Sequence, residues 1–376
     1  MKQEILFAKN EYKNLDIYLQ KNSLKNIMIV CGSSYKQLGI SDYFENITSR
    51  LGINVLFFSD FQPNPVYESV EKGIALFKKN KCDSIIAIGG GSAMDVAKCI
   101  KLFSNMDSSI NYLTQKIIPN DIKYLAVPTT AGTGSEATKY AVIYYEGEKQ
   151  SISDDSCIPS AVLFDSSLLK TLPLYQKKST VLDALCHSIE SFWSINSTEE
   201  SKVYSRKALD LILENLESYL ANEDSGNEKM LLAANYAGKA INITQTTAGH
   251  AMCYKLTSLY KIAHGHAAAL CVKVLWEYMI ENLDLCIDSR GKEYLKEMLI
   301  DIAKTMNCQS IEKSFDKYNE ILRDLSLPVP EVSSSEEYNI LNSSVNHDRL
   351  KNHPIKLSKE SLEMLYHQIL DKRESV

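Results

Sequence analysis

The first half of the chain alternates short apolar runs with amphipathic stretches, and this alternation limits the possible folds more than any other feature. The apolar, β-branched runs are residues 27–30, 54–58, 84–88 and 124–127. Stretches with the apolar spacing of helices, 67–79 and 93–103, lie on either side of the third run. Short continuous apolar strands separated by helices are typical of a parallel sheet covered on both faces. We therefore predict a doubly wound α/β domain whose ligand crevice lies at the carboxyl ends of the strands.

The pattern changes after Asp165, and from Leu172 onward the chain is nearly all helical in its apolar spacing. Long periodic runs with few strand candidates predict an all-α second half. The segment from Pro159 to Pro173 is therefore predicted to be a hinge. We divide the chain into an α/β domain, residues 1–170, and a helical domain, residues 171–376.

Charge and cysteine content exclude several classes of function. The net charge is −6 and the basic residues are scattered, so we expect no nucleic-acid partner. Nine cysteines without a CxxC pair indicate a reducing compartment. Lys9 interrupts the apolar patch near the N-terminus, which argues against a signal peptide, and no apolar run approaches the roughly 20 residues of a membrane span. We expect a cytoplasmic protein with no membrane partner.

Two loops rich in glycine and hydroxyl side chains follow predicted strands. The first is Gly89-Gly90-Gly91-Ser92, which opens a helix with Asp95 in its first turn. Glycines let the backbone approach a phosphate, and a helix N-terminus supplies unpaired N–H groups. The second loop, residues 128–136, holds four hydroxyls and two glycines in a nine-residue span. Glycine clusters also mark ordinary turns, and hydroxyl-rich loops also cap helices. Because both loops end neighbouring strands, we favour a dinucleotide site.

A third group of residues has the chemistry of a metal site. Asp183 and His187 are four residues apart in a helical stretch and therefore project from one face. Alone, this pair is better explained as an Asp–His hydrogen bond. His250 and His264, however, lie in a second apolar segment, and a shared cation is an efficient partner for several buried imidazoles. We predict a divalent metal bound by these four residues.

The remaining histidines are not predicted as ligands. His266 cannot face the same way as His264 at the start of a helix, so we exclude it. His347, His353 and His367 lie in a polar stretch and are predicted to be surface residues.

Together these motifs resemble the iron-containing (group III) alcohol dehydrogenase family. The matches extend to Lys98, to Gly265 and to Pro63-Asn64-Pro65. Each motif alone is unspecific, but the set is highly specific. The resemblance implies an N-terminal Rossmann-like domain that binds the dinucleotide, an all-α C-terminal domain that binds metal and substrate, and an active site in the cleft between them.

The resemblance also implies roles for single residues. The metal would be Fe²⁺, although Zn²⁺ or another divalent ion can occupy such sites, and its ligands would be Asp183, His187, His250 and His264. The cofactor contacts would be Asn64, Gly90, Gly91, Ser92, Asp95, Thr129, Thr130, Thr133 and Lys149. The family is commonly dimeric or larger, so we expect a homo-oligomer.

The chain departs from the family pattern at two positions. Many members carry a second histidine four residues after the position of His250, where this chain has Tyr254. That residue could donate a proton or pack on the nicotinamide. Members that prefer NAD often have an aspartate after the first strand, where this chain has Gly32, followed by Ser33, Ser34 and Lys36. Without that carboxylate a 2′-phosphate is not repelled, so we predict a preference for NADP(H) over NAD(H).

The substrate is predicted from two further segments. Residues 250–270 and 349–354 resemble the phosphonoacetaldehyde reductase (hydroxyethylphosphonate dehydrogenase) subgroup. A phosphonate needs cationic partners, for which Lys255 and Arg349 are the candidates, although both could be ordinary surface charges. The alternatives are a general dehydrogenase of short primary alcohols, of the propanediol or butanol type, and a metal-dependent lyase like the dehydroquinate synthases. A non-catalytic binding protein is the weakest alternative, because all four ligand positions are intact.

Overall fold

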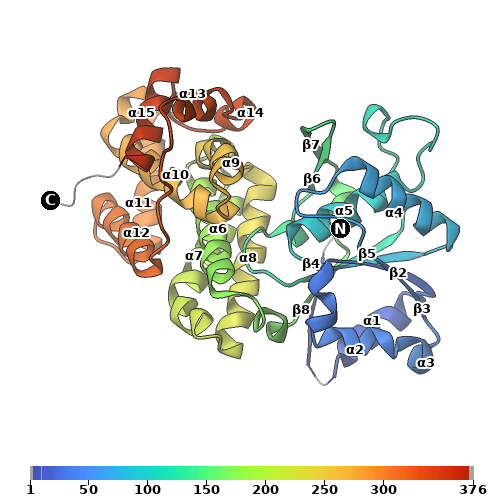
Figure 1. Cartoon of the computed structure of the whole chain (residues 1–376). Coiled ribbons are helices and arrows are strands. Elements are labelled where there is room, and N and C mark those ends of the chain that lie inside the picture. The colour runs from blue at the N-terminus through green and yellow to red at the C-terminus, as the bar shows by residue number, and fades with distance from the viewer. Residues whose placement is uncertain (1–2, 10, 372–376) are drawn as a thin grey trace. The chain divides into compact units, whose positions relative to one another are not determined.

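The computed structural model describes residues 3–9 and 11–371, which divide into two compact units (Figure 1). Unit 1 comprises the chain up to Leu172 together with Ala221–Asn235, and unit 2 comprises Pro173–Leu220 and the chain from Tyr236 onward. The predicted domains meet at one boundary, after residue 170. In the structure, however, residues 221–235 also belong to unit 1. The assignment of the dinucleotide to one domain and of the metal to the other stays a prediction.

Unit 1 is built on a six-stranded, wholly parallel sheet with the strand order β1-β8-β5-β4-β2-β3. Its strands are β1 (Glu4–Phe7), β2 (Asn26–Cys31), β3 (Asn54–Phe58), β4 (Ser84–Gly89), β5 (Lys123–Pro128) and β8 (Ala161–Phe164). A separate antiparallel hairpin consists of β6 (Tyr140–Tyr145) and β7 (Glu148–Ser153). The predicted α/β fold with a parallel sheet, followed by a helical half, is confirmed.

Helices cover both faces of the sheet, as the continuous apolar strands require. The helices of unit 1 are α1 (Lys13–Lys21), α2 (Ile40–Glu45), α3 (Ile47–Leu51), α4 (Tyr67–Lys79) and α5 (Gly91–Phe103). Figure 1 shows α1, α2 and α3 on one face and α4 and α5 on the other. Alternate residues of β2 divide between the faces: Ile27 and Ile29 belong to the core cluster that includes α1 and α2, while Met28 and Val30 face the other way.

The sheet contains two strands that the sequence pattern did not predict. β1 and β8 have only four residues each, and β8 lies within the segment 159–173 that was predicted to be a hinge. That prediction was wrong for residues 161–164, which pair with β1 inside the sheet, and of which Ala161 and Val162 also pair with β5. The boundary between the units falls at the end of the segment, after Leu172.

The strand order creates a switch point between β2 and β4. From β2 the chain first adds β3 on one side and then β4 on the other, so that the connections leave these two neighbours in opposite directions. In doubly wound sheets ligands bind beyond the carboxyl ends of the strands at such a point. Here those ends are Cys31, which pairs with Ile88, and Gly89, which pairs with Pro128 of β5.

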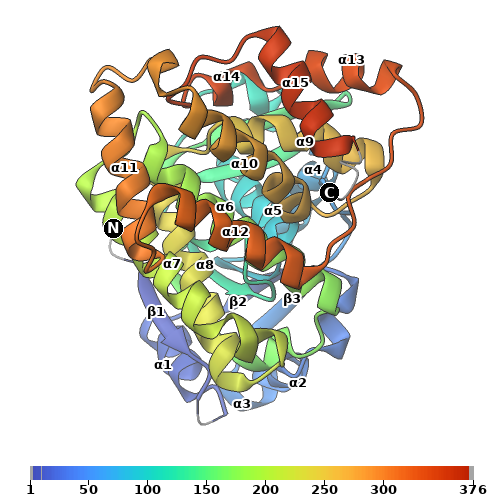
Figure 2. The same ribbon diagram turned by 90° about the vertical axis from the view of Figure 1, so that its left-hand side faces the viewer.

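Unit 2 is helical throughout the part that the structure describes as regular. Its helices are α6 (Leu174–Trp193), α7 (Glu199–Leu220), residues 236–244 of α8 (Asp224–Thr244), α9 (Ala248–Tyr260), α10 (His264–Glu281), α11 (Lys292–Thr305), α12 (Ile311–Leu325), α13 (Glu336–Ser343), α14 (His347–Leu350) and α15 (Lys359–Leu370). α10 lies at the centre, in contact with α6, α9, α12 and α15 (Figure 2). In the described residues, no helix has both the length and the apolar character that a membrane crossing needs.

Candidate metal centre and nucleotide loops

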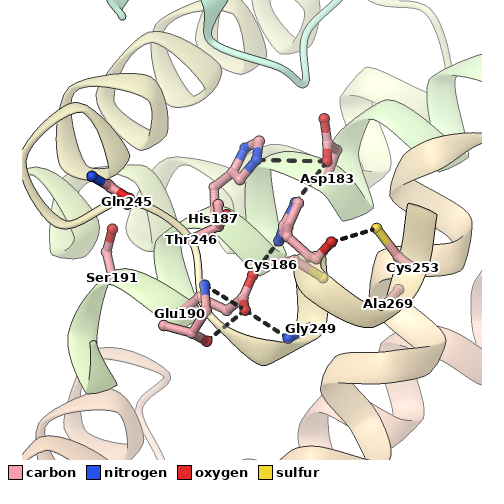
Figure 3. A network of polar contacts seen from close by, with 12 residues as sticks. Asp183, Cys186, His187, Glu190, Ser191, Gln245, Thr246, Gly249, Cys253 and Ala269 are labelled. Atoms are coloured by element: carbon pink, nitrogen blue, oxygen red, sulfur yellow. Dashed lines mark hydrogen bonds and ion pairs between the residues drawn. The ribbon is translucent and has the colours of Figure 1, made fainter. Parts of the chain in front are cut away.

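Helix α6 presents three ionisable side chains on one face. Asp183, His187 and Glu190 are spaced four and three residues apart, so they lie above one another along the helix. The helix packs between α7 and α10, and the residue exposures are 3%, 5% and 0%. Figure 3 shows Asp183 and His187 in contact, with Glu190 farther along the same helix.

The first turn of α9 adds His250 to this face. Its Nε2 lies 3.3 Å from Asp183 Oδ1, and Nε2 of His187 lies 3.7 Å from the same oxygen. The two imidazole rings stack with their centroids 4.5 Å apart. One potential ligand atom from each of the three residues lies within 4.8 Å of the other two. Three of the four predicted ligands are therefore brought to one point.

This donor set fits a divalent metal ion. Two donor atoms that each lie about 2.1 Å from one ion are separated by roughly 3.0–3.4 Å. The separations of 3.3 and 3.7 Å between the histidine nitrogens and the Asp183 oxygen are close to that range. Two imidazoles with one carboxylate suit Fe²⁺, Zn²⁺ and other first-row divalent ions, so the donors do not select among them.

The electrostatics of the site follow from its burial. Burial would raise the pKa of Asp183, but the charge of His187 and the hydrogen bond from His250 hold that pKa well below its usual range. For His250, burial would lower the pKa, but Glu190 and Asp183 raise it to about 9. The site thus stabilises positive charge beside an ionised Asp183, and a bound cation would be stabilised by the same carboxylate.

The fourth predicted ligand, His264, lies beside the three. It is the first residue of α10, and its ring centroid is 5.4 Å from that of His250. Its Nδ1 is 3.6 Å from Sγ of Cys253, and its charge contributes to the low pKa of Asp183. It is not among the three residues whose ligand atoms lie within 4.8 Å of one another. Its role as a ligand stays a prediction.

Gly265 lets α10 approach α6 closely enough to bring His264 to this site. A Cβ atom on Gly265 would lie 2.1 Å from the carbonyl oxygen of Ser179 and 2.7 Å from Cβ of Asp183. No side chain fits such a gap, because both neighbours are held by the backbone of α6. The glycine that follows the predicted ligand is therefore required by packing.

Glu190 was missed by the sequence reasoning, although a signal for it exists. It is seven residues after Asp183, or two helical turns, and thus continues the line of Asp183 and His187. A carboxylate in an otherwise apolar helical stretch is unusual unless it has a partner. Burial would raise its pKa, but His250 and a hydrogen bond from Thr247 lower the pKa of Glu190 to about 2.

The predicted substrate residues differ in how they relate to the metal centre. Tyr254 stacks on His264 with ring centroids 5.6 Å apart, and Arg349 hydrogen-bonds its side chain. Burial raises the pKa of Tyr254 above its usual range, so the phenol is protonated. Arg349 also donates from Nη1 to Oε1 of Gln245 at 2.9 Å. Lys255 follows Tyr254 but is five residues from His250, roughly 140° around the helix from it.

Two of the histidines that were not predicted as ligands are buried. His266 is 1% exposed, and its Nδ1 contacts the hydroxyl of Tyr175 at 3.3 Å rather than the metal ligands. His353 is 0% exposed, so the prediction that it is a surface residue was wrong. Its polar sequence context suggested exposure, but its ring contacts the loop at 245–247, where Nδ1 lies 3.4 Å from Oγ1 of Thr247.

In unit 1, the predicted nucleotide residues follow the carboxyl ends of three adjacent strands. Gly32 with Ser33 and Ser34 follows β2, Gly90 with Gly91 and Ser92 follows β4, and Thr129 with Thr130 follows β5. The two later loops touch each other. A Cβ on Gly90 would lie 3.2 Å from Oγ1 of Thr130, and one on Gly91 would lie 3.4 Å from Cγ2 of Thr133.

Lys98 fastens the second loop to helix α5. Its ammonium group is fully buried and donates to Oγ of Ser135, Oγ1 of Thr138 and the carbonyl of Tyr140 at 2.9, 3.2 and 2.7 Å. Burial lowers the pKa of Lys98, while the neighbouring Asp95 raises it. The same burial raises the pKa of Asp95 to about 6. This pair is therefore part of the framework of the two loops.

The last two predicted cofactor residues lie near each other but on other elements. Asn64 is exposed and has φ of 59° in the loop before α4. Lys149 is on β7, opposite Tyr144 of β6, whose N–H donates to the carbonyl of Pro65 at 2.8 Å. Contact of either residue with a nucleotide stays a prediction.

Comparison with known protein families gives two matches that together span most of the chain. Residues 2–166 match the model of the iron-containing alcohol dehydrogenases, and residues 177–370 match the model of the C-terminal part of the Fe-containing alcohol dehydrogenase family.

The similar proteins include enzymes named for different substrates. The chain is 32% identical to aldehyde-alcohol dehydrogenase 2 of Entamoeba histolytica over 274 residues, which are 68% of this chain but 31% of that protein. It therefore spans about a third of such aldehyde-alcohol dehydrogenases. It is 28% identical to the NADPH-dependent butanol dehydrogenase of Clostridium saccharobutylicum, covering 78% of this chain and 82% of that one.

Among solved structures, the chain is similar to the sulfoacetaldehyde reductase from Bifidobacterium kashiwanohense in complex with NAD⁺. The TM-score is 0.86 with 24% sequence identity, covering 98% of this chain and 97% of that chain. At this identity the likeness is evidence for the fold alone.

Replacing Gly265 with alanine should abolish metal binding. The new Cβ has no room, so α10 must move away from α6. Over-packing of this kind typically costs about 1–3 kcal/mol or more and shifts the backbone. Elemental analysis after dialysis against Zn²⁺ should show the metal content fall well below that of the wild type. Gly39→Ala is the matched control, since its Cβ meets nothing within 4 Å. Full metal occupancy in Gly265→Ala would contradict this account of the packing.

Proposed function

The chain belongs to the iron-containing alcohol dehydrogenase family, and on this premise we propose that it is a metal-dependent, NAD(P)-linked alcohol dehydrogenase or aldehyde reductase. The observation that carries the proposal is the buried group of Asp183, His187 and His250, whose ligand atoms lie within 4.8 Å of one another. Burying two imidazoles beside a carboxylate is costly unless each is partnered, and a shared divalent ion would partner all three.

We assign the residues as follows. Asp183, His187 and His250, with His264 as the fourth ligand, would hold a divalent ion, for which we propose Fe²⁺. Such an ion would supply Lewis-acid stabilisation of a carbonyl or alkoxide oxygen, and a bound reduced nicotinamide would supply the hydride. Tyr254, stacked on His264, would donate a hydrogen bond or the proton that the alkoxide needs, or pack on the nicotinamide. These assignments stay predictions, as do the cytoplasmic location and the homo-oligomeric state.

For the substrate we propose a short aldehyde with an anionic end group, phosphonoacetaldehyde in the first place, which would be reduced to 2-hydroxyethylphosphonate. The support is the surroundings of Arg349, a half-buried cation that hydrogen-bonds both Tyr254 and Gln245. Tyr254 interacts with both Arg349 and His264. A planar guanidinium suits the oxygens of a phosphonate, and the sulfonate of sulfoacetaldehyde has a similar shape and charge.

The loop that orients Arg349 is tied to the metal centre. Gln245 has φ of 58°, in the left-handed region, and its Oε1 accepts from both Arg349 and Asn352. Asn352 also donates to the carbonyl of Thr246 at 3.0 Å. The segment 349–353 is thereby fixed to residues 245–247, which directly precede α9 and His250. Lys255 has no comparable support, so Arg349 is the stronger candidate for the anion.

The main alternative is a dehydrogenase of short, uncharged primary alcohols. The similarity to an NADPH-dependent butanol dehydrogenase favours it, and Arg349 would then serve only to hold the loop at 245–247. A lyase related to dehydroquinate synthase would retain its nucleotide with no net consumption of NAD(P)H. Turnover of nucleotide with an aldehyde separates the two classes.

Removing the Arg349 guanidinium should affect anionic and neutral aldehydes differently. In metal-reconstituted protein, Arg349→Ala should lower kcat/KM for phosphonoacetaldehyde by about 30-fold or more, since loss of a partly desolvated charge partner costs at least about 2 kcal/mol. The value of kcat/KM for butanal should change little. The ratio of the two kcat/KM values therefore separates loss of the anion's partner from general damage to the site. Arg323→Ala, at an exposed arginine of α12, is the control. Equal losses for both aldehydes would contradict an anionic substrate, and higher activity of the wild type with butanal would favour the alternative.

The nucleotide preference should be controlled by Gly32. We propose that the wild type prefers NADPH, because no carboxylate follows β2 to repel the 2′-phosphate. A Cβ atom at Gly32 would meet no atom within 4 Å, so Gly32→Asp should fold normally and shift the preference by about tenfold toward NADH. Gly39→Asp adds the same charge at another open position of unit 1 and should leave the ratio unchanged. The idea fails if the wild type already prefers NADH by about tenfold.

A further inference from the structure

Glu190 is a fully buried carboxylate that contacts four polar groups of three residues, all in or near the first turn of α9 (Figure 3). Its Oε1 accepts from the N–H groups of Thr247 and Gly249 at 3.1 and 2.9 Å and from the Thr247 hydroxyl at 2.6 Å. Its other oxygen, Oε2, is in close contact with Nδ1 of His250. The two oxygens of one carboxylate thus have separate partners.

The contact with Nδ1 decides which nitrogen of His250 can bind a metal. An ionised carboxylate can only accept hydrogen bonds, so Nδ1 must carry the proton that it donates to Glu190. In a neutral imidazole the other nitrogen, Nε2, then presents its lone pair. Nε2 is the atom that lies 3.3 Å from Oδ1 of Asp183. Glu190 therefore turns the metal-binding nitrogen of His250 toward the other ligands.

We propose that Glu190 is a positioning residue of the metal centre, which fixes the tautomer and the orientation of His250 and increases its donor strength. The proposal rests on the metal site of the proposed function and adds to it a residue that does not itself touch the ion. A carboxylate behind a metal-binding histidine commonly has this effect.

The arrangement is more than a cap for α9. Thr247 is the N-cap residue of that helix, yet its side chain does not cap it. Its hydroxyl instead donates to Glu190 and accepts from Nε1 of Trp193 at 3.0 Å. A neutral side chain would satisfy a helix start, whereas burying a carboxylate is costly unless a positive or strongly donating partner compensates it. His250 is that partner.

The space around Glu190 is closed as well. A Cβ on Gly249 would lie 3.0 Å from Oε1 of Glu190 and 2.6 Å from a methyl carbon of Val272. The carboxylate therefore has little room to rotate, and Oε2 stays directed at His250.

The proposal is tested by the affinity of the folded protein for Zn²⁺, measured by competition with a chromophoric chelator. Glu190→Gln keeps the shape but removes the charge, and it should weaken Zn²⁺ binding by about 10–100-fold. The matched control is Ser191→Ala, which removes a buried hydrogen bond to Thr244 Oγ1 from the next position of α6 and should leave the affinity within about threefold of the wild type. Circular dichroism confirms that each variant is folded.

A second measurement does not depend on any variant. In Zn²⁺-loaded wild-type protein with ¹⁵N-labelled histidine, His250 should show a protonated, exchange-protected Nδ1 and a metal-bound Nε2. A metal-bound Nδ1, or equal Zn²⁺ affinities of Glu190→Gln and wild type, would overturn the role of Glu190. If the wild type itself binds no Zn²⁺ or Fe²⁺, the proposed function fails instead.

Discussion

The attraction between one buried carboxylate, that of Asp183, and the imidazoles around it is the interaction on which the candidate metal centre depends. Oδ1 of Asp183 lies 3.7 Å from His187 and 3.3 Å from His250, and the three side chains are almost completely buried. An ionised group in such a position is strongly destabilising unless positive charge compensates it. The close approach at Gly265 and the contact between Glu190 and His250 both serve to keep these groups at one point.

In unit 1 the constraint is topological. Because β2, β4 and β5 are adjacent parallel strands, the loops after Cys31, Gly89 and Pro128 lie at the same end of the sheet. The connections from β2 and β4 leave in opposite directions at that end. The close packing of Gly90 on Thr130 and the buried ammonium of Lys98 then hold two of these loops together. Unit 1 thus holds the candidate loops for the dinucleotide, and unit 2 holds the candidate metal centre.

The sequence predicted those features that depend on local periodicity. Helix α4 has the predicted bounds, 67–79, and four of the strands were found because each is a continuous apolar run. The residues of β2, β4 and β5 are almost all buried, whereas the edge strand β3 is partly exposed. β8 was not found, since a strand of four residues after Pro159 carries too little periodicity. His353 and Glu190 were misjudged for another reason: their partners, Thr247 and His250, are 106 and 60 residues away along the chain. Contacts at that separation are decided by tertiary packing.

The central claim is that a divalent ion is bound by Asp183, His187 and His250. The most direct test is an anomalous difference map from crystals of iron-loaded protein, collected at the iron absorption edge. The account predicts one strong peak about 2.0–2.3 Å from Asp183 Oδ1 and from Nε2 of both histidines, with His264 as the fourth ligand. A peak elsewhere in the chain, or density for a hydrogen-bonded Asp183–His250 pair with no anomalous signal, would contradict it.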